Sequence, residues 1–165
     1  MQTHYYQPLW TLVGGGQKTV EDSAKPMSEV IPSGCDWIKE HCAEIDPKTS
    51  EIRLSNNSTG SIKYDYLVVA AGIHIDWDKI DGLVDALEND PSVCSNYSPI
   101  YVKKTFNAIQ QLKDGDQALF TFPNTPIKCA GAPQKIMYLA DAYLRQVCFF
   151  FSMFDLQLFL LFSIY

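Results

Sequence analysis

One cysteine stands where a thiol can do chemistry. Cys129 follows the sequence ALFTFP, which predicts a short strand, and precedes a segment with the spacing of an amphipathic helix. Free amides and the partial positive charge at a helix start stabilise an anion, so this position favours the thiolate. Lys128 and Lys135 add positive charge, and Gly131 lets the backbone approach a planar ring or a substrate. These features predict a nucleophilic or redox-active thiol, with a packed thiol in an ordinary turn as the alternative.

The other potential ligands form no pattern of a metal site or of a disulfide framework. The chain has 5 cysteines, an odd number, and 3 scattered histidines, and no Cys-x-x-Cys occurs in it. We therefore expect no bound metal and a reducing environment. On the residues alone, ordinary packing or surface roles are expected for Cys35, Cys42, Cys94 and Cys148.

A triple glycine, Gly14–Gly16, closes the first apolar stretch, PLWTLVG. Glycine permits tight turns and close backbone approach. No strand precedes these glycines within a βαβ unit, so they do not make the G-x-G-x-x-G fingerprint of a dinucleotide-binding loop. The aromatic residues Tyr5, Tyr6 and Trp10 are expected in the core, with a cofactor wall as the alternative.

Composition excludes several classes of protein. The length of 165 residues suits about one domain. With 47% hydrophobic and 19% charged residues, the chain is too apolar for a disordered tail and too mixed for a multi-span membrane protein. Its 13 basic and 19 acidic residues leave a net charge of −6 without a basic stripe, which excludes nucleic acid as the expected partner.

Strands and turns are predicted in the first half of the chain. The polar stretch 17–26 predicts a loop, and Cys35–Ile45 predicts a strand after a Pro-Ser-Gly turn. Glu51–Ser55 alternates like a half-exposed strand. Tyr66–Ala70 is apolar throughout and is followed by small residues, which predicts a strand buried on both faces of a parallel sheet.

Helices dominate the prediction for the second half. Residues 76–95 predict a variable loop, and Tyr101–Lys113 places Val102, Phe106, Ile109 and Leu112 on one helical face. After the strand ALFTFP, a helix is predicted with Pro133 in its first turn. Its apolar face is predicted to consist of Ile136, Leu139, Ala140 and Tyr143.

The chain ends in an apolar tail from Cys148 to Tyr165, CFFFSMFDLQLFLLFSIY. Its Leu, Ile and Phe residues each favour membrane insertion by roughly 0.3 to 0.6 kcal/mol, and Asp155 near the centre offsets most of this. An out-of-place tail (from translation past a splice boundary), a buried strand or helix, and a membrane anchor are the three alternatives. We expect the first, a tail that does not pack into the sheet.

Several segments resemble the mitochondrial sulfide:quinone oxidoreductases of the animal type. The longest is FPNTPIKCAGAPQKIMYL, which surrounds Cys129. The resemblance covers about residues 3–147 and ends at Cys148. The other similar segments, in the same order as in the family, are HYYQPLWTLVGGG, VIPSGCDWIKEHCAEI, KYDYLVVAAGI, SNYS and the helix around Phe106.

The resemblance implies an α/β fold, part of a flavoprotein with two dinucleotide-binding, Rossmann-like domains and a small antiparallel β insertion. It implies that residues 1–75 are an incomplete FAD-binding portion, that 76–147 belong to the second Rossmann-like domain, and that 148–165 are unlike the family. The family oxidises hydrogen sulfide through a cysteine persulfide and passes electrons through FAD to ubiquinone. A small thiol or sulfite is the implied sulfur acceptor, and the implied location is mitochondrial, associated with the inner membrane.

Three site residues follow from the resemblance. Cys129 matches the catalytic cysteine that carries the sulfane sulfur, Gln7 matches an FAD-contacting glutamine, and Cys42 falls where a strand meets the adenine end of FAD. The family's G-x-G-x-x-G is expected before Met1, and a second redox cysteine and membrane-facing helices are expected after Tyr165. The alternative function is a non-catalytic truncated product. A generic pyridine-nucleotide-disulfide oxidoreductase fragment is disfavoured because the Cys-x-x-x-x-Cys redox pair is absent.

Overall fold

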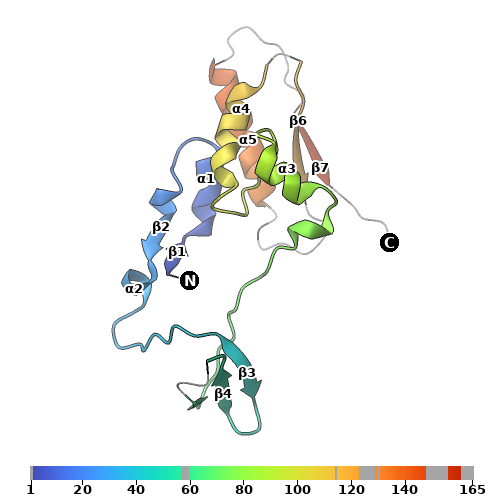
Figure 1. The fold of residues 1–165 in the computed structure, drawn as a ribbon. Helices are drawn as coiled ribbons and strands as arrows, with labels where there is room; N and C mark the ends of the chain where they lie inside the picture. Colours follow the sequence, from blue (N-terminus) through green and yellow to red (C-terminus); the bar gives the residue numbers. More distant parts are fainter. Residues whose placement is uncertain are drawn as a thin grey trace. The chain divides into compact units, whose positions relative to one another are not determined.

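The computed structural model describes residues 2–56, 60–113, 115–122, 129, 131–147 and 156–160. The chain has mixed helices and strands and divides into two compact units (Figure 1). The smaller unit comprises Pro26–Asp76 with the first two residues, and the larger comprises Thr3–Lys25 with Trp77–Tyr165. The assignment of 1–75 and 76–147 to two domains of a longer protein stays a prediction.

Three helices build the core of the larger unit: α1 (Trp10–Gly14), α4 (Val102–Gln111) and α5 (Gly131–Val147). The predicted apolar faces of α4 and α5 are confirmed in part. Val102, Ile109, Ile136 and Ala140 are buried as predicted, at helical spacing. The other four predicted residues are half-buried: Phe106, Leu112, Leu139 and Tyr143. Two apolar clusters result. One consists of Trp10, Val13, Val20 and Val102, and the other of Ile109, Ile136, Ala140 and Leu144.

A βαβ arrangement follows α4. The predicted strand is present as β6 (Ala118–Phe122), and it pairs in parallel with β7 (Leu156–Leu160) after the chain has passed through α5. The expectation that the tail stays outside the sheet is therefore wrong for Leu156–Leu160. The edge of β6 carries unpaired amides and carbonyls, and a β-prone apolar segment satisfies them. The other tail residues lie outside the described residues.

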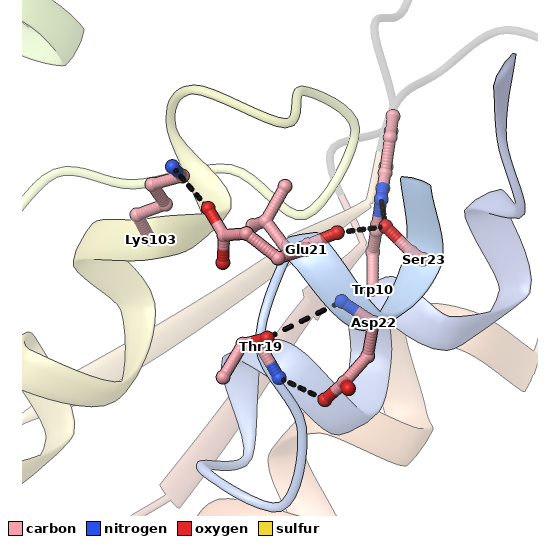
Figure 2. A network of polar contacts seen from close by, with 7 residues as sticks. Trp10, Thr19, Glu21, Asp22, Ser23 and Lys103 are labelled. Atoms are coloured by element: carbon pink, nitrogen blue, oxygen red, sulfur yellow. Dashed lines mark hydrogen bonds and ion pairs between the residues drawn. The ribbon is translucent and has the colours of Figure 1, made fainter. Parts of the chain in front are cut away.

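The stretch 17–26, predicted as a loop, is ordered into the 3-10 helix η2 (Glu21–Ser23) and the strand β2 (Ala24–Pro26), which pairs with β1 (Thr3–Tyr5). Figure 2 shows the polar contacts responsible. The Thr19 amide donates to Asp22 Oδ2 at 2.9 Å, and the Asp22 amide donates to Thr19 Oγ1 at 3.3 Å. These two hydrogen bonds satisfy backbone amides of the turn that would otherwise lack an acceptor. The Thr19–Asp22 pair is therefore a local signal for an ordered turn, which the polar composition of the stretch did not indicate.

Ser23 ties η2 to the core. The buried indole N–H of Trp10 donates to Ser23 Oγ at 3.1 Å (Figure 2). The Ser23 hydroxyl donates to the Val20 carbonyl at 2.6 Å. Trp10 is therefore a core residue, as expected, with Tyr5 packed at its edge. Tyr6 is 59% exposed, so its expected core position is wrong.

Residues 76–95 are not only a loop. They contain the 3-10 helix η3 (Trp77–Lys79) and the helix α3 (Leu83–Asn89). Lys104 of α4 donates from Nζ to the carbonyls of Leu87 (2.7 Å) and Asp90 (2.6 Å), so it satisfies the last carbonyls of α3. This cap comes from another helix, which is why the local sequence did not reveal it.

A three-stranded antiparallel sheet forms the main part of the smaller unit. Its strands are β3 (Cys42–Asp46), β4 (Glu51–Leu54) and β5 (Ser61–Lys63), in the order β3-β4-β5. The strand predicted over Glu51–Ser55 is confirmed, whereas the one predicted over Cys35–Ile45 begins only at Cys42. The short helix α2 (Met27–Val30) precedes this sheet in the chain.

The buried strand predicted over Tyr66–Ala70 is absent. These residues are coil, and the side chains of Tyr66, Val68 and Val69 are 95%, 87% and 68% exposed. A strand buried on both faces needs neighbouring strands and covering helices. No described strand lies beside this segment, so its apolar pattern alone does not produce a strand.

Candidate functional site

Cys129 lies between β6 and α5, as the sequence predicts, and its side chain is exposed. The Ala132 amide donates to the Cys129 carbonyl at 3.3 Å, which joins the cysteine to the first turn of α5. A Cβ placed on Gly131 would lie 3.9 Å from the Cys129 Sγ, so the thiol is in ordinary contact distance of the helix start. The exposure argues against the alternative of a packed thiol.

The structure describes one of the two lysines predicted to lie near the thiol. Lys135 is exposed on α5, while Lys128 lies outside the described residues. The helix start itself is described, because α5 begins at Gly131, two residues after Cys129.

Tyr97 is a neighbour of Cys129 that the sequence did not predict. Burial, and then the negative charge of the Cys129 thiolate, raise the pKa of the Tyr97 phenol. The Coulomb interaction weakens with distance, so the effect places Tyr97 in the electrostatic surroundings of Cys129. The segment SNYS was singled out by resemblance, but nothing in its spacing relative to Cys129 indicates this interaction.

The loop that carries Tyr97 is anchored to two helices through Asn96. The Thr105 hydroxyl of α4 donates to Asn96 Oδ1 at 2.9 Å. The same amide group packs on α1, because a Cβ placed on Gly14 would lie 2.8 Å from Asn96 Oδ1. The predicted close approach at the triple glycine is thus confirmed, and its effect is to hold the Tyr97 loop. Asn96 Nδ2 is buried and finds no hydrogen-bond partner among the described residues.

The second glycine of the triplet brings α1 against α5. A Cβ placed on Gly15 would lie 3.0 Å from Leu139 Cβ, closer than side chains normally approach. Since α5 begins beside Cys129, this packing fixes the direction in which the helix start points. The glycines therefore help to position the thiol site through the close packing of α1 on α5.

The two other predicted site residues, Gln7 and Cys42, belong to different units of the chain. Gln7 is exposed in the 3-10 helix η1 (Gln7–Leu9) of the larger unit. Cys42 is exposed at the start of β3, in the smaller unit, and its thiol points to the Glu44 carbonyl at 3.8 Å. The roles of Gln7 and Cys42 stay predictions.

Neither a metal centre nor a membrane span was detected in the described part of the chain. No group of three or more potential His, Cys, Asp or Glu ligands occurs there. Helices long and apolar enough to cross a membrane are likewise missing from that part.

Comparison with known proteins identifies similar chains. No protein-family model matches. The mitochondrial sulfide:quinone oxidoreductase of Mus musculus is 50% identical over 145 residues, which is 88% of this chain and 31% of that protein. The protein of the same name from Dictyostelium discoideum is 45% identical over the same shares. That of Schizosaccharomyces pombe is 40% identical over 87% of this chain and 31% of its own length.

A solved structure supports the fold. The sulfide:quinone oxidoreductase of Aquifex aeolicus matches with a TM-score of 0.61 and 21% identity, over 89% of this chain and 32% of that one. The mixed helix and sheet fold is thus shared, and the family resemblance predicted from the sequence is confirmed. The chain spans about a third of the length of the curated relatives it matches, 31% in each case.

Proposed function

We propose that this chain, a relative of the sulfide:quinone oxidoreductases over 88% of its length, is the part of such an enzyme that carries its sulfur-bearing cysteine. The observation behind the proposal is the position of Cys129, an exposed thiol at the start of α5 and beside Tyr97. The whole activity proposed is FAD-dependent oxidation of hydrogen sulfide through a cysteine persulfide. Ubiquinone takes the electrons, and a small thiol or sulfite takes the sulfur.

The chemistry proposed for Cys129 is thiol–disulfide exchange. Sulfide is a nucleophile, so its oxidation needs a sulfur electrophile, for which we propose a disulfide between Cys129 and a second cysteine of the whole enzyme. Hydrosulfide attacks one sulfur, the S–S bond breaks, and one cysteine leaves as a thiolate while the other keeps the added sulfur as a persulfide. Amides at the start of α5 stabilise the anionic sulfur in either case.

The described residues do not form a phosphate-binding site for FAD. Such a site needs free amides at a helix N-terminus with glycines that leave room for the pyrophosphate. Gly14 instead ends α1, and side chains from α5, α4 and the Tyr97 loop fill the space beside Gly14–Gly16. Gln7 and Cys42 are therefore proposed only as peripheral contacts to FAD in the whole enzyme.

The second candidate function is a non-catalytic truncated product that binds FAD weakly and does not turn over. The filled glycine turn favours it, because the chain offers no described cradle for the pyrophosphate. Flavin absorbance of the purified chain after gel filtration separates the two candidates. A stoichiometric flavin content contradicts the second candidate, and its absence supports it.

The Rossmann-like organisation is also a proposal. It is supported by the parallel pairing of β6 with β7 around α5, since a βαβ crossover is the unit from which such domains are built. The antiparallel sheet β3-β4-β5 is proposed as the small insertion of this flavoprotein class. A mitochondrial location follows from the names of the three curated relatives, and inner-membrane association is proposed with it.

The role of Cys129 is tested in the full-length enzyme. We expect Cys129→Ser to abolish sulfide-dependent quinone reduction while FAD stays bound, because the serine hydroxyl cannot carry sulfane sulfur. Cys35→Ser, at an exposed cysteine of the smaller unit, is the matched control and is expected to keep most activity. Substantial turnover by the Cys129→Ser enzyme would overturn the assignment.

The 165-residue chain allows a direct test of the thiol. Brief treatment with polysulfide, followed by mass spectrometry of blocked peptides, measures how fast each cysteine gains a sulfur atom. Cys129 is expected to react faster than Cys35 and Cys42, which are also exposed but are not at a helix start. Equal rates at the three cysteines would contradict the proposed activation.

A further inference from the structure

The loop that carries Tyr97 is fixed on both sides of this residue. The Tyr97 amide donates to Ser95 Oγ at 3.2 Å. On the other side, the Ile100 amide donates to Ser98 Oγ at 3.1 Å, and the Val102 amide donates to the Ser98 carbonyl at 3.0 Å. Serine side chains that accept hydrogen bonds from nearby amides stabilise one conformation of a loop. Tyr97 is therefore held next to the start of α4.

The same loop lies against the first turns of α5. A Cβ placed on Gly14 would lie 2.8 Å from Asn96 Oδ1 and 3.0 Å from Ile136 Cδ1, so these two side chains meet at one glycine of α1. Ile136 lies in the second turn of α5, about 7.5 Å along the axis from the start of the helix. Asn96, and with it Tyr97, is therefore held on the half of α5 that begins beside Cys129.

The Tyr97 phenol is available as a hydrogen-bond donor. Among the described residues its hydroxyl donates to no other group, and its side chain is 37% exposed, so a species that arrives from solvent can reach it. Burial and the charge of Cys129 both raise the pKa of the phenol, which therefore keeps its proton at neutral pH. This electrostatic effect agrees with the packing of the loop on α5, because the Coulomb interaction weakens with distance.

A persulfide at Cys129 has an outer sulfur that needs stabilisation. The added atom lies about 2 Å beyond Sγ, the length of an S–S bond. It carries the negative charge at neutral pH, because a persulfide is more acidic than the thiol from which it forms. A Cβ placed on Gly131 would lie 3.9 Å from Sγ, so the start of α5 is in contact distance of the inner sulfur. The outer sulfur extends one bond further and gains from a donor on another segment.

We propose, on the basis of the proposed function, that the Tyr97 phenol donates a hydrogen bond to the outer sulfur of a persulfide at Cys129. The proton stays on the phenol oxygen, and the electron pair stays on the sulfur. Asn96 is then a positioning residue, because its hydrogen bond from Thr105 holds the loop against α1 and α5. A hydrogen bond to the charged form of a group lowers its pKa. Tyr97 therefore keeps the persulfide anionic at a pH at which it would otherwise take up a proton.

The purified chain tests the hydrogen bond. Polysulfide loads Cys129, because the thiolate attacks one of its sulfur atoms and the shortened polysulfide leaves with the electron pair of the broken S–S bond. Brief reaction with iodoacetamide over a pH series then alkylates the anionic persulfide, and mass spectrometry of the Cys129 peptide gives the midpoint of its titration. Tyr97→Phe is expected to raise this midpoint by about one pH unit, because it removes the hydroxyl and keeps the ring. An unchanged midpoint would overturn the proposal.

Two controls separate this hydrogen bond from a general effect on the site. Tyr138→Phe removes an exposed phenol of α5 and is expected to leave the persulfide midpoint unchanged. In the unloaded Tyr97→Phe chain, the midpoint of the Cys129 thiol should move much less than that of the persulfide, because only the outer sulfur accepts the hydrogen bond. Equal shifts of thiol and persulfide, or an equal shift in Tyr138→Phe, would contradict the proposal.

Thr105→Val tests the anchor of the loop. This change removes the donor to Asn96 Oδ1 and keeps the shape of the buried side chain. The persulfide midpoint is expected to rise by less than in Tyr97→Phe, because the phenol is still present but its loop is held less firmly. No rise in Thr105→Val would refute the positioning role of Asn96.

The rate of loading reports separately on the proposed function. If Cys129 gains sulfur no faster than Cys35 and Cys42, the proposed activation of the thiol fails, while the midpoint can still be measured on the loaded Cys129 peptide. If Cys129 loads fastest and Tyr97→Phe leaves the midpoint unchanged, the hydrogen bond alone is refuted.

Discussion

Replacing Gly16 by alanine tests whether the triple glycine acts through packing. Gly16 has a φ of +72°, and a Cβ placed on it would lie 2.4 Å from the ring of Phe106. Phe106 cannot move freely, because its ring packs edge-on against Tyr143 with 4.9 Å between centroids. The substitution therefore carries two separate free-energy costs, one for the left-handed backbone and one for the clash with Phe106.

The expected magnitude is the sum of those costs. A side chain in the left-handed region costs about 1–2 kcal/mol, and the steric clash that displaces the Phe106 ring costs about 1–3 kcal/mol. Gly16→Ala should therefore lower the free energy of unfolding by about 2–5 kcal/mol. Gly115→Ala is the control, since Gly115 has a φ of +85° and no described atom within 4 Å of its Cβ position. Gly115→Ala therefore carries only the cost of the left-handed backbone.

Urea unfolding of both variants at one temperature measures the difference, with an unchanged slope as the sign of an unchanged unfolding transition. The extra loss in Gly16→Ala, about 1–3 kcal/mol, corresponds to a Tm lower than that of Gly115→Ala by about 2–12 °C. In the Phe106→Ala background, Gly16→Ala should cost less, because the clashing ring is gone. Equal losses in Gly16→Ala and Gly115→Ala would refute the packing argument.

Three further outcomes are expected. Ser23→Ala should lower the free energy of unfolding by about 1–3 kcal/mol in urea, because it leaves the buried indole N–H of Trp10 without an acceptor. Cys129→Ser should lower the pKa of the Tyr97 phenol, seen as earlier ionisation in an ultraviolet pH titration, because it removes a negative charge; burial keeps the pKa above its ordinary value. Truncation after Val147 should lower the urea midpoint, because β6 loses its parallel partner.

Each of these outcomes has its own control. Ser92→Ala, at an exposed serine bonded to Asp90, should change stability by less than about 0.5 kcal/mol. Cys35→Ser, in the other unit, should leave the Tyr97 titration unchanged, and a shift of the same size would contradict the electrostatic effect of Cys129 on Tyr97. An unchanged midpoint after truncation would mean that the tail is foreign to the fold after all.

The helices of the larger unit follow from the sequence because their signals are local. The 3.6-residue spacing of Val102, Ile109 and their neighbours defines an apolar face wherever the helix packs. The same holds for α5, whose first turn receives Pro133. The position of Cys129 between a strand and a helix start was predictable for this reason. So was the resemblance to the sulfide:quinone oxidoreductases, because the similar segments are long and in order.

Only the tertiary structure determined the features that depend on residues distant in the chain, such as which apolar segments form strands. The Tyr66–Ala70 pattern predicts a buried strand, yet without a neighbouring strand the segment stays exposed. Leu156–Leu160 become a strand only because β6 offers a free edge. The charge of Cys129 acts on Tyr97, whose loop is held to α1 and α4 through Asn96. Spacing along the chain reports which face a residue occupies, whereas hydrogen bonds and charges act between whichever groups the fold brings together.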